Sequence, residues 1–522
     1  MSMTQEPIDW DEDVVVDNAE IYESLVRAIG LTEEFGLFFV RSGNAVELGQ
    51  RLRVDLPRLK FADLELTEEL KDGNLYRKVK EISQAVGPLN GVIISGLEKS
   101  LDPYVKSGYG GLGDYYNKDM VPRILGHLNL QRERFRDDFP FCLIFVLSAF
   151  GIKYIARRAP DFFDWRSGLF EFVPDADTLG KLTQEMYGDY REYLTWSHEQ
   201  RIDRIREIQA LIDEDQQTTN GKANLFLEKG TILGADQSYK ESVASYEKAI
   251  EIKPDLYQAW NNRGNSLDDL GRKEEAIASY EKAIEIKPDD DEAWYNLGNS
   301  LSALGRKEEA IASYEKAIEI KPDYHEAWYN LGSSLSTLGQ KEEAIASYEK
   351  AIEIKPDLYQ AWNNLGVSLS ALLGREEEAI VSYEKAIEIK PNLYQAWYNR
   401  GISLSALGQK EEAISSYEKA IGVKPDYYEA WNNQGVSLSA LGRKKEAIES
   451  YEKALGFKPD YHEAWYNRAC SYSLHGEFDR AISDLAEAIR LEPEHYRKLA
   501  ATNSDFELLR GDSRFLRMLN EE

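Results

Sequence analysis

The residues best suited to chemistry follow the first stretch that reads as a β-strand, residues 37–41. A glycine-containing loop after such a strand can cradle phosphate with its backbone amides, if Lys and then Ser or Thr follow to supply charge and a magnesium ligand. Two glycines lie within 41–51, but Gln50 and Arg51 stand where the Lys–Ser/Thr pair is needed. The candidate nucleotide-binding residues are Ser42, Gly43 and, at the end of the third predicted strand over 92–95, Glu98.

The missing Lys–Ser/Thr pair predicts that this loop does not support NTP turnover. None of the six histidines has metal-ligand spacing, and the sequence contains neither a nucleophile elbow nor a matched pair of catalytic carboxylates. We therefore expect no enzyme activity, no cofactor and no metal. Nucleotide binding without hydrolysis stays open as an alternative.

A second set of polar residues recurs at intervals of 34 or 35 residues. An amide both donates and accepts hydrogen bonds, so a row of asparagines can pair with a peptide backbone whatever its side chains, and tyrosines add contact area at low entropic cost. The alternative is that the asparagines only satisfy neighbouring backbone groups. The candidate peptide-binding residues are Asn262, Asn296, Asn330, Asn364, Asn399, Asn433 and Asn467, with Tyr295, Tyr329, Tyr398 and Tyr466 directly before four of them.

The same repeat of 34 or 35 residues defines the helices that carry these side chains. One unit, residues 293–326, predicts a helix over 293–304 that stops at Gly305 and a second helix over 307–320 that ends before Pro322. Each helix has one apolar stripe at helical spacing. A single unit cannot bury both stripes, so neighbouring units must stack.

The unit has an ordered pattern of aromatic, small and large apolar residues. It reads Trp294, Leu297, Gly298, Leu301, Ala310, Tyr314, Ala317 and Pro322. These repeat positions resemble the tetratricopeptide repeat family. The resemblance implies an all-α solenoid that winds into a superhelix, and we count eight repeats over 225–495, with Gln237 in place of the inter-helix glycine in the first. Residues 496–522 are expected to form a capping helix.

The asparagine ladder is similar to that of the superhelical repeats of the O-GlcNAc transferase family, which implies that it holds an extended peptide by its backbone.

The first part of the chain, residues 1–178, has a different pattern. Apolar runs that read as strands alternate with helical stretches, which predicts a parallel α/β sheet. Residues 179–224 read as a connecting helix, over 179–212, and a polar linker. The predicted strands are 37–41, 58–64, 92–95, 141–147 and 169–173.

Two segments of this domain, 128–133 and 158–172, resemble the NTPase-like module of bacterial, often cyanobacterial, signalling proteins related to STAND ATPases. The resemblance implies a P-loop-like sheet, here degenerate, that serves as a docking or oligomerisation platform. The alternative is a nucleotide-regulated switch in which the repeats act as the sensor.

The overall charge narrows the range of partners. The chain of 522 residues has 63 Lys and Arg against 92 Asp and Glu, a net charge of −29. Such a chain is expected to avoid nucleic acid and anionic membranes, and to favour a protein or extended peptide that is not acidic. Self-association through the repeats is possible. Two cysteines, a start without a secretory signal and no apolar run longer than 139–152 predict a cytoplasmic protein.

Overall fold

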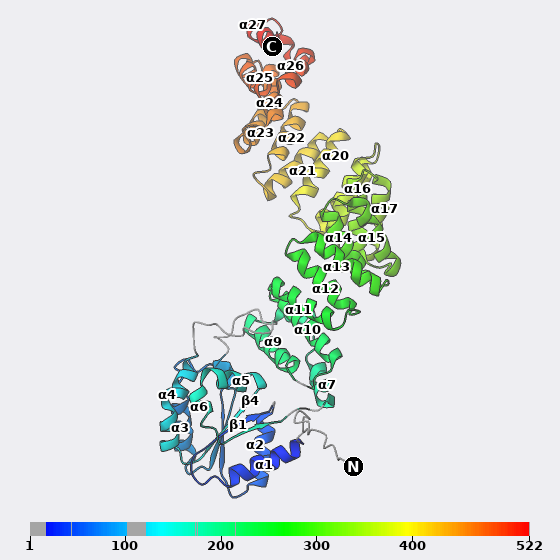
Figure 1. Cartoon of the computed structure of the whole chain (residues 1–522). Helices are drawn as coiled ribbons and strands as arrows, with labels where there is room; N and C mark the ends of the chain where they lie inside the picture. The colour runs from blue at the N-terminus through cyan, green and yellow to red at the C-terminus, as the bar shows by residue number, and fades with distance from the viewer. Residues whose placement is uncertain are drawn as a thin grey trace, which may run out of the picture. The chain divides into compact units, whose positions relative to one another are not determined.

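The computed structural model divides the chain into two compact units, Met1–Ile286 and Lys287–Glu522 (Figure 1). The first unit contains the sheet domain and the first two repeats, and the second contains the other repeats and the C-terminal helices. The structure describes residues 17–42, 44–101, 122–172, 174, 176–214 and 216–520. Gly43 therefore lies outside the described residues.

A five-stranded parallel sheet forms the centre of the N-terminal domain. Its strand order is β2-β3-β4-β1-β5, and Gly36 pairs with Cys142 while Phe38 pairs with Gly168. All five predicted strands are confirmed, as is their parallel direction. The strands are β1 (Gly36–Arg41), β2 (Phe61–Glu65), β3 (Gly91–Ser95), β4 (Cys142–Leu147) and β5 (Gly168–Glu171).

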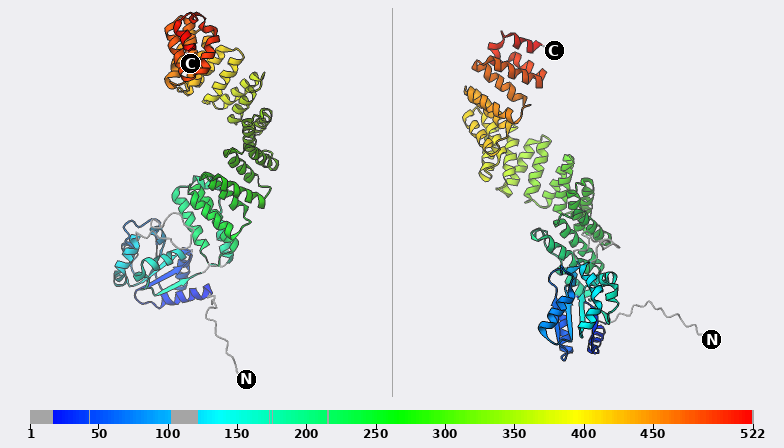
Figure 2. Two further views of the ribbon diagram at one scale, coloured as in Figure 1. Left: turned by 45° about the horizontal axis from the view of Figure 1, so that its top comes forward. Right: turned by 90° about the vertical axis from the view of Figure 1, so that its left-hand side faces the viewer.

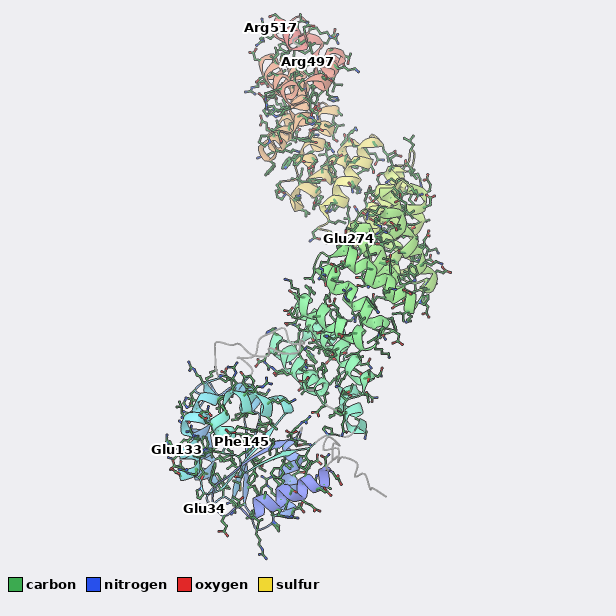
Figure 3. The ribbon with its side chains drawn as sticks, viewed as in Figure 1. Glu34, Glu133, Phe145, Glu274, Arg497 and Arg517 are labelled. Atoms are coloured by element: carbon green, nitrogen blue, oxygen red, sulfur yellow. The ribbon has the colours of Figure 1, made fainter. Side chains whose placement is uncertain are left out.

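Helices cover both faces of this sheet, as alternation along each strand requires. Leu37 and Phe39 of β1 belong to the larger core cluster, with residues of α3, α4, α5 and α6, whereas Phe38 and Val40 belong to the cluster with α1 and α2. Phe145 of β4, labelled in Figure 3, is fully buried in the larger cluster. The helices are α1 (Asn18–Gly30), α2 (Ala45–Asp55), α3 (Leu75–Val86), the short 3-10 helix η1 (Leu97–Ser100), α4 (Arg123–Asp138), α5 (Ala149–Arg158) and α6 (Pro160–Phe163).

The single helix predicted over 179–212 is wrong. The structure has three helices there, α7 (Ala176–Glu185), α8 (Tyr190–Thr195) and α9 (His198–Ile212). Polar caps start the last two: Asp189 accepts a hydrogen bond from the Arg191 amide, and Ser197 forms a capping box with Gln200. These caps compete with continuation of one helix.

The repeats follow as helix pairs that stack within each unit (Figure 2). In the first unit these are α10 (Thr219–Ala235), α11 (Tyr239–Ile252), α12 (Tyr257–Asp269) and α13 (Lys273–Ile286). In the second they are α14 (Asp291–Ala303), α15 (Lys307–Ile320), α16 (His325–Thr337), α17 (Lys341–Ile354), α18 (Tyr359–Ser370), α19 (Glu376–Ile389), α20 (Tyr394–Ala406), α21 (Lys410–Val423), α22 (Tyr428–Ala440), α23 (Lys444–Phe457), α24 (His462–His475) and α25 (Phe478–Leu491).

Two glycines show why the unit needs its small residues. Gly305 turns the chain between α14 and α15 with a φ of 80°, which L side chains rarely adopt. Gly298 lies against the buried ring of Tyr314, where an added Cβ would come within 2.6 Å of Cε1. In the first repeat Gln237 takes the turn position with a φ of 61°, so this divergent repeat carries local backbone strain.

The chain after the last repeat packs against it. It forms α26 (Pro493–Thr502), the 3-10 helix η3 (Ser504–Leu509) and α27 (Ser513–Asn520), where a single capping helix was expected. Asn503 interrupts the helix because its side chain accepts a hydrogen bond from the Asp505 amide at 2.9 Å. Phe506 and Phe515 are buried in one cluster with Leu485 of the last repeat.

Candidate functional site

The carboxyl edge of the sheet is the first candidate site. β1 and β4 lie side by side, and their connections leave toward opposite sides of the sheet, to β2 and to β5. A ligand crevice in an open α/β sheet forms outside such a pair of strand ends. The structure brings Ser42 and Glu98 to this edge: the Ser42 amide donates to the Leu147 carbonyl at 3.2 Å, and Glu98 accepts from the Ser148 amide at 2.8 Å.

The Glu98 carboxylate forms hydrogen bonds within the fold. Besides the Ser148 amide it accepts from the Ser148 hydroxyl at 3.2 Å, and that hydroxyl also caps α5 through the Gly151 amide. Burial raises the pKa of the Glu98 carboxyl, and the Ser148 donors offset part of this rise. Glu98 therefore anchors the start of α5, and its neutral form is favoured more than that of an exposed glutamate.

The start of α2, where a phosphate would meet free amides, is already capped. The Asn44 Oδ1 accepts a hydrogen bond from the Glu47 backbone amide at 3.0 Å, and the Asn44 Nδ2 donates to the Glu47 carboxylate at 3.3 Å. Glu47 also places a negative charge in the first turn, which disfavours a bound anion there.

Arg41, at the end of β1, is a charged residue that the sequence analysis did not select. It is 7% exposed, its Nη1 lies 3.6 Å from Glu171, and its Nη2 pairs with Glu214. Its Nε is buried and has no hydrogen-bond partner among the described residues. A lone arginine carries no spacing signal, so only the fold reveals that a cation reaches this edge and that two carboxylates neutralise it.

The asparagine ladder is the second candidate site. The seven asparagines all lie on first helices of the repeats and are half-buried. In Asn330, Asn364, Asn399, Asn433 and Asn467 the side-chain amide donates to a tyrosine or asparagine one repeat earlier, and Asn330 donates in addition to the Asn299 side-chain oxygen of that repeat at 2.9 Å. These bonds are Asn330 to Tyr295 at 3.2 Å, Asn364 to Tyr329 at 3.2 Å, Asn399 to Asn363 at 3.4 Å, Asn433 to Tyr398 at 3.1 Å and Asn467 to Asn432 at 3.1 Å. Asn262 lies on α12 and Asn296 on α14.

The ladder tyrosines do not all have the same surroundings. Tyr295, Tyr329 and Tyr398 are half-buried. Tyr466 is only 6% exposed, stacks on Tyr496 of α26 with ring centroids 4.9 Å apart, and accepts a hydrogen bond from Asn503 at 2.8 Å. The C-terminal helices thus cover Tyr466, and it is not part of the surface proposed below.

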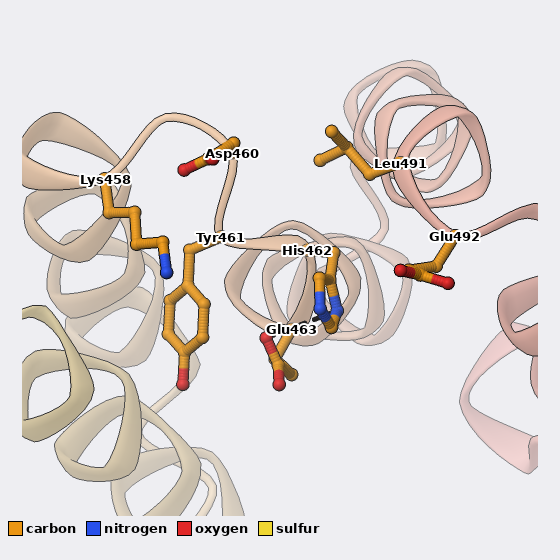
Figure 4. A pocket seen from close by; sticks show the side chains of 7 residues that line it. All are labelled: Lys458, Asp460, Tyr461, His462, Glu463, Leu491 and Glu492. Atoms are coloured by element: carbon orange, nitrogen blue, oxygen red, sulfur yellow. Dashed lines mark ion pairs between the residues drawn. The ribbon is translucent and has the colours of Figure 1, made fainter.

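A second group of tyrosines, which the sequence analysis missed, lies just before the first helix in three of the repeats. The signal was present in the repeat ends, which read KPDY at Tyr324, Tyr427 and Tyr461. Close to the last of these the surface has a hollow of about 370 Å³. Figure 4 shows the side chains that line it. The hollow is lined by Lys458, Asp460, Tyr461, His462, Glu463, Leu491 and Glu492.

Two kinds of site are not found in the described part of the chain. No group of three or more His, Cys, Asp or Glu side chains is arranged to hold a metal ion. No helix there is long and apolar enough to cross a membrane.

Comparison with known proteins identifies the repeats. A TPR repeat model matches residues 264–305 and 371–408, and tetratricopeptide repeat models match 223–256, 245–278, 291–324, 325–358, 398–462 and 462–495. No curated protein matches the chain.

Several solved structures are similar to parts of the chain. YrrB, a TPR protein with an unusual peptide-binding site, is 27% identical over 36% of this chain and 96% of its own, with a TM-score of 0.33. A MamA protein is 26% identical over 33% of this chain and 92% of its own, with a TM-score of 0.31. Part of a TPR repeat-containing protein from Cytophaga hutchinsonii is 19% identical over 46% of this chain and 98% of its own, with a TM-score of 0.41.

Proposed function

Because the chain belongs to the tetratricopeptide repeat family, whose members generally mediate contacts between proteins, we propose that it is an interaction scaffold that binds an extended segment of a partner protein. The observation that carries this proposal is the row of half-buried asparagines on the first helices of the second unit, where half-buried tyrosines directly precede three of them. A row of this kind meets an extended chain at regular intervals.

The inter-repeat bonds leave hydrogen-bonding capacity for a ligand. A carboxamide has two N–H donors and an oxygen with two lone pairs. Asn330 donates to both Tyr295 and Asn299 of the preceding repeat and keeps its oxygen for a ligand, whereas the bond from Asn364 to Tyr329 uses one donor. The Asn364 oxygen, for example, accepts from Asn363 at 3.2 Å and retains a second lone pair. The ladder therefore has two roles in this proposal: it joins neighbouring repeats, and it presents the remaining amide groups to a peptide backbone.

The sheet domain fits a docking or oligomerisation platform better than an enzyme. Asn44 and Glu47 occupy the start of α2, Glu98 is bonded to Ser148, and Arg41 is paired with two carboxylates. The alternative is a nucleotide-regulated switch, which the strand order and the buried Arg41 Nε favour. Phosphate release from ATP and GTP with magnesium, and binding of a fluorescent nucleotide, separate the two: turnover would rule out the platform, and binding without turnover would favour the switch.

The test of the scaffold starts with partner capture from native lysate by the full chain. The captured partner is then measured against a triple variant in which Asn330, Asn364 and Asn399 become alanine. We expect its affinity to fall by a few kcal/mol at most, since each lost bond is worth about 0.5–1.5 kcal/mol.

A matched control substitutes exposed residues on the second helices of the same three repeats, Ala346→Gln, Val381→Gln and Ser415→Gln. It should bind like the unchanged protein. Equal binding by the ladder variant and the control would place the ligand outside the ladder.

A further inference from the structure

Glu429 differs from two of its equivalents, Glu326 and Glu463, in how its charge is balanced. Glu326 and Glu463 each follow a histidine, whose Nδ1 lies 2.9 Å from Glu326 and 3.2 Å from Glu463. At the equivalent position Glu429 follows Tyr428, which cannot become a cation. Within the described residues, the Glu429 Oε2 is shielded from solvent and has no hydrogen-bond partner.

Tyrosine rings that pack on one another lie close enough to this carboxylate for its charge to act on Tyr398, Tyr427 and Tyr461. Tyr427 packs against Tyr398 with ring centroids 4.8 Å apart and against Tyr394 at 5.1 Å, both edge to face, and Tyr428 packs in the same way on Tyr461 at 4.8 Å. Burial chiefly, and the nearby Glu429 charge in addition, raises the pKa of Tyr398. The charge of Glu429 thus acts on rings from both neighbouring repeats.

Lysines of the chain already lie over two of these rings, with Lys424 Nζ 5.3 Å from the Tyr427 ring centre and Lys458 Nζ 5.6 Å from that of Tyr461. Lys424 Nζ lies 4.8 Å from the Tyr394 ring centre, and Lys458 Nζ lies 4.6 Å from that of Tyr428. Ring faces are negative, so a cation over them is stabilised, most of all where water is partly excluded. The hydrogen bond to Tyr428, with the Glu429 charge as a lesser cause, raises the pKa of Lys458, so Lys458 balances part of the Glu429 charge from a distance. Among the described residues neither lysine forms an ion pair with this half-buried carboxylate.

We infer that Glu429, Tyr398, Tyr427 and Tyr461 form a site for a cationic side chain, arginine or lysine, of the bound partner segment. This inference rests on the proposed function, because the cation arrives on a peptide held by the ladder. The proposed cation site and the asparagine ladder are in direct contact, since the Tyr398 hydroxyl accepts a hydrogen bond from Asn433 of the ladder at 3.1 Å. A guanidinium would supply donors to the carboxylate and a flat cation to the rings.

The repeats provide variants that should keep the fold. Leu358 and Leu393 occupy the position of Tyr427 in other repeats, and Asn363 and Asn432 occupy that of Tyr398. Tyr427→Leu and Tyr398→Asn therefore introduce residues that the equivalent helix pairs of other repeats already accommodate. Glu429→Gln removes the charge and keeps the shape.

The test uses the full chain and a short fluorescein-labelled Gly/Ser peptide with one central arginine, compared with the same peptide carrying neutral citrulline. Binding is followed by fluorescence anisotropy. We expect the arginine peptide to bind more tightly than the citrulline peptide, and Glu429→Gln or Tyr427→Leu to remove about a tenfold preference, the equivalent of roughly 1.4 kcal/mol. Lys458→Met should strengthen binding of the arginine peptide, because it removes a competing cation from the rings.

The controls are Glu326→Gln and Glu463→Gln, which change the net charge equally but act where a histidine pairs with the carboxylate. They should leave the arginine preference unchanged. Equal loss in all three variants would overturn the site and assign the preference to the overall negative charge. A captured partner that still binds Glu429→Gln and Tyr427→Leu at full affinity would also overturn the site, while the scaffold proposal would fail only if the ladder variant lost nothing.

Discussion

The hydrogen bond between Asn364 and Tyr329 tests how far the asparagine ladder stabilises neighbouring repeats. The Asn364 amide donates to the Tyr329 hydroxyl of the preceding repeat at 3.2 Å, and both residues are half-buried. A neutral bond of this kind has a net value of about 0.5–1.5 kcal/mol. We therefore expect a double-mutant cycle of Asn364→Ala and Tyr329→Phe to give a coupling energy of about 1 kcal/mol in the stability of these two repeats.

The matched pair is Asn399 and Asn363, one repeat further on. Their atoms are 3.4 Å apart, beyond the usual range for an N–H donor and an oxygen, so the coupling should be smaller, about 0.5 kcal/mol or less. The ranking of the two couplings is thus fixed by geometry before any measurement is made.

Native-state hydrogen exchange is the suitable assay. A repeat array unfolds in parts, so one melting curve of the whole chain does not report on a single interface. Exchange of the amides of α16 and α18 gives the opening free energy of the two helices that the bond connects. Zero coupling energy between Asn364 and Tyr329 would refute a structural role for the ladder. Its side-chain amides would then serve ligand binding only.

Three further predictions concern stability. Gly298→Ala should destabilise the chain by about 1–3 kcal/mol, because the new methyl group meets a buried tyrosine ring, whereas Gly422→Ala meets nothing within 4 Å and should stabilise it by up to about 1 kcal/mol; chemical denaturation measures both. Phe506→Ala, at a fully buried position of the C-terminal cap, should cost about 3–5 kcal/mol and lower the melting temperature, while Leu508→Ala, 74% exposed, should not. Glu98→Gln should raise the melting temperature at neutral pH and not at low pH: burial raises the pKa of the carboxyl, so the fold loses stability as pH rises through that pKa and Glu98 becomes charged. An equal effect of Glu98→Gln at every pH would contradict this assignment.

The sheet and the repeats could be predicted because their signals are local and redundant. Each strand is an apolar run between helical stretches, and burial on both faces makes such runs continuous, as in β4, where all six residues are buried. The helix pairs are marked by a glycine at the turn and a proline after the second helix. Both signals depend on the chain near the element that they predict.

The connecting region could not be predicted in the same way. Residues 179–212 are compatible with a helix throughout, and the breaks depend on Asp189 and Ser197 taking capping positions. The neutralisation of Arg41 at the sheet edge could not be predicted either, because its partners Glu171 and Glu214 are distant in sequence. Pairs of this kind are set by tertiary packing.

The near-identity of the repeats makes each difference between them informative. Leucine at Leu358 and Leu393 and tyrosine at Tyr427 occupy one position in equivalent helix pairs, so the fold does not require the tyrosine ring. The ring adds aromatic surface beside Glu429, a carboxylate that also lacks the neighbouring histidine present at Glu326. Folding requirements are met equally by both residues, so a buried carboxylate oxygen without a hydrogen-bond partner among the described residues, beside the added ring, points to binding as its purpose.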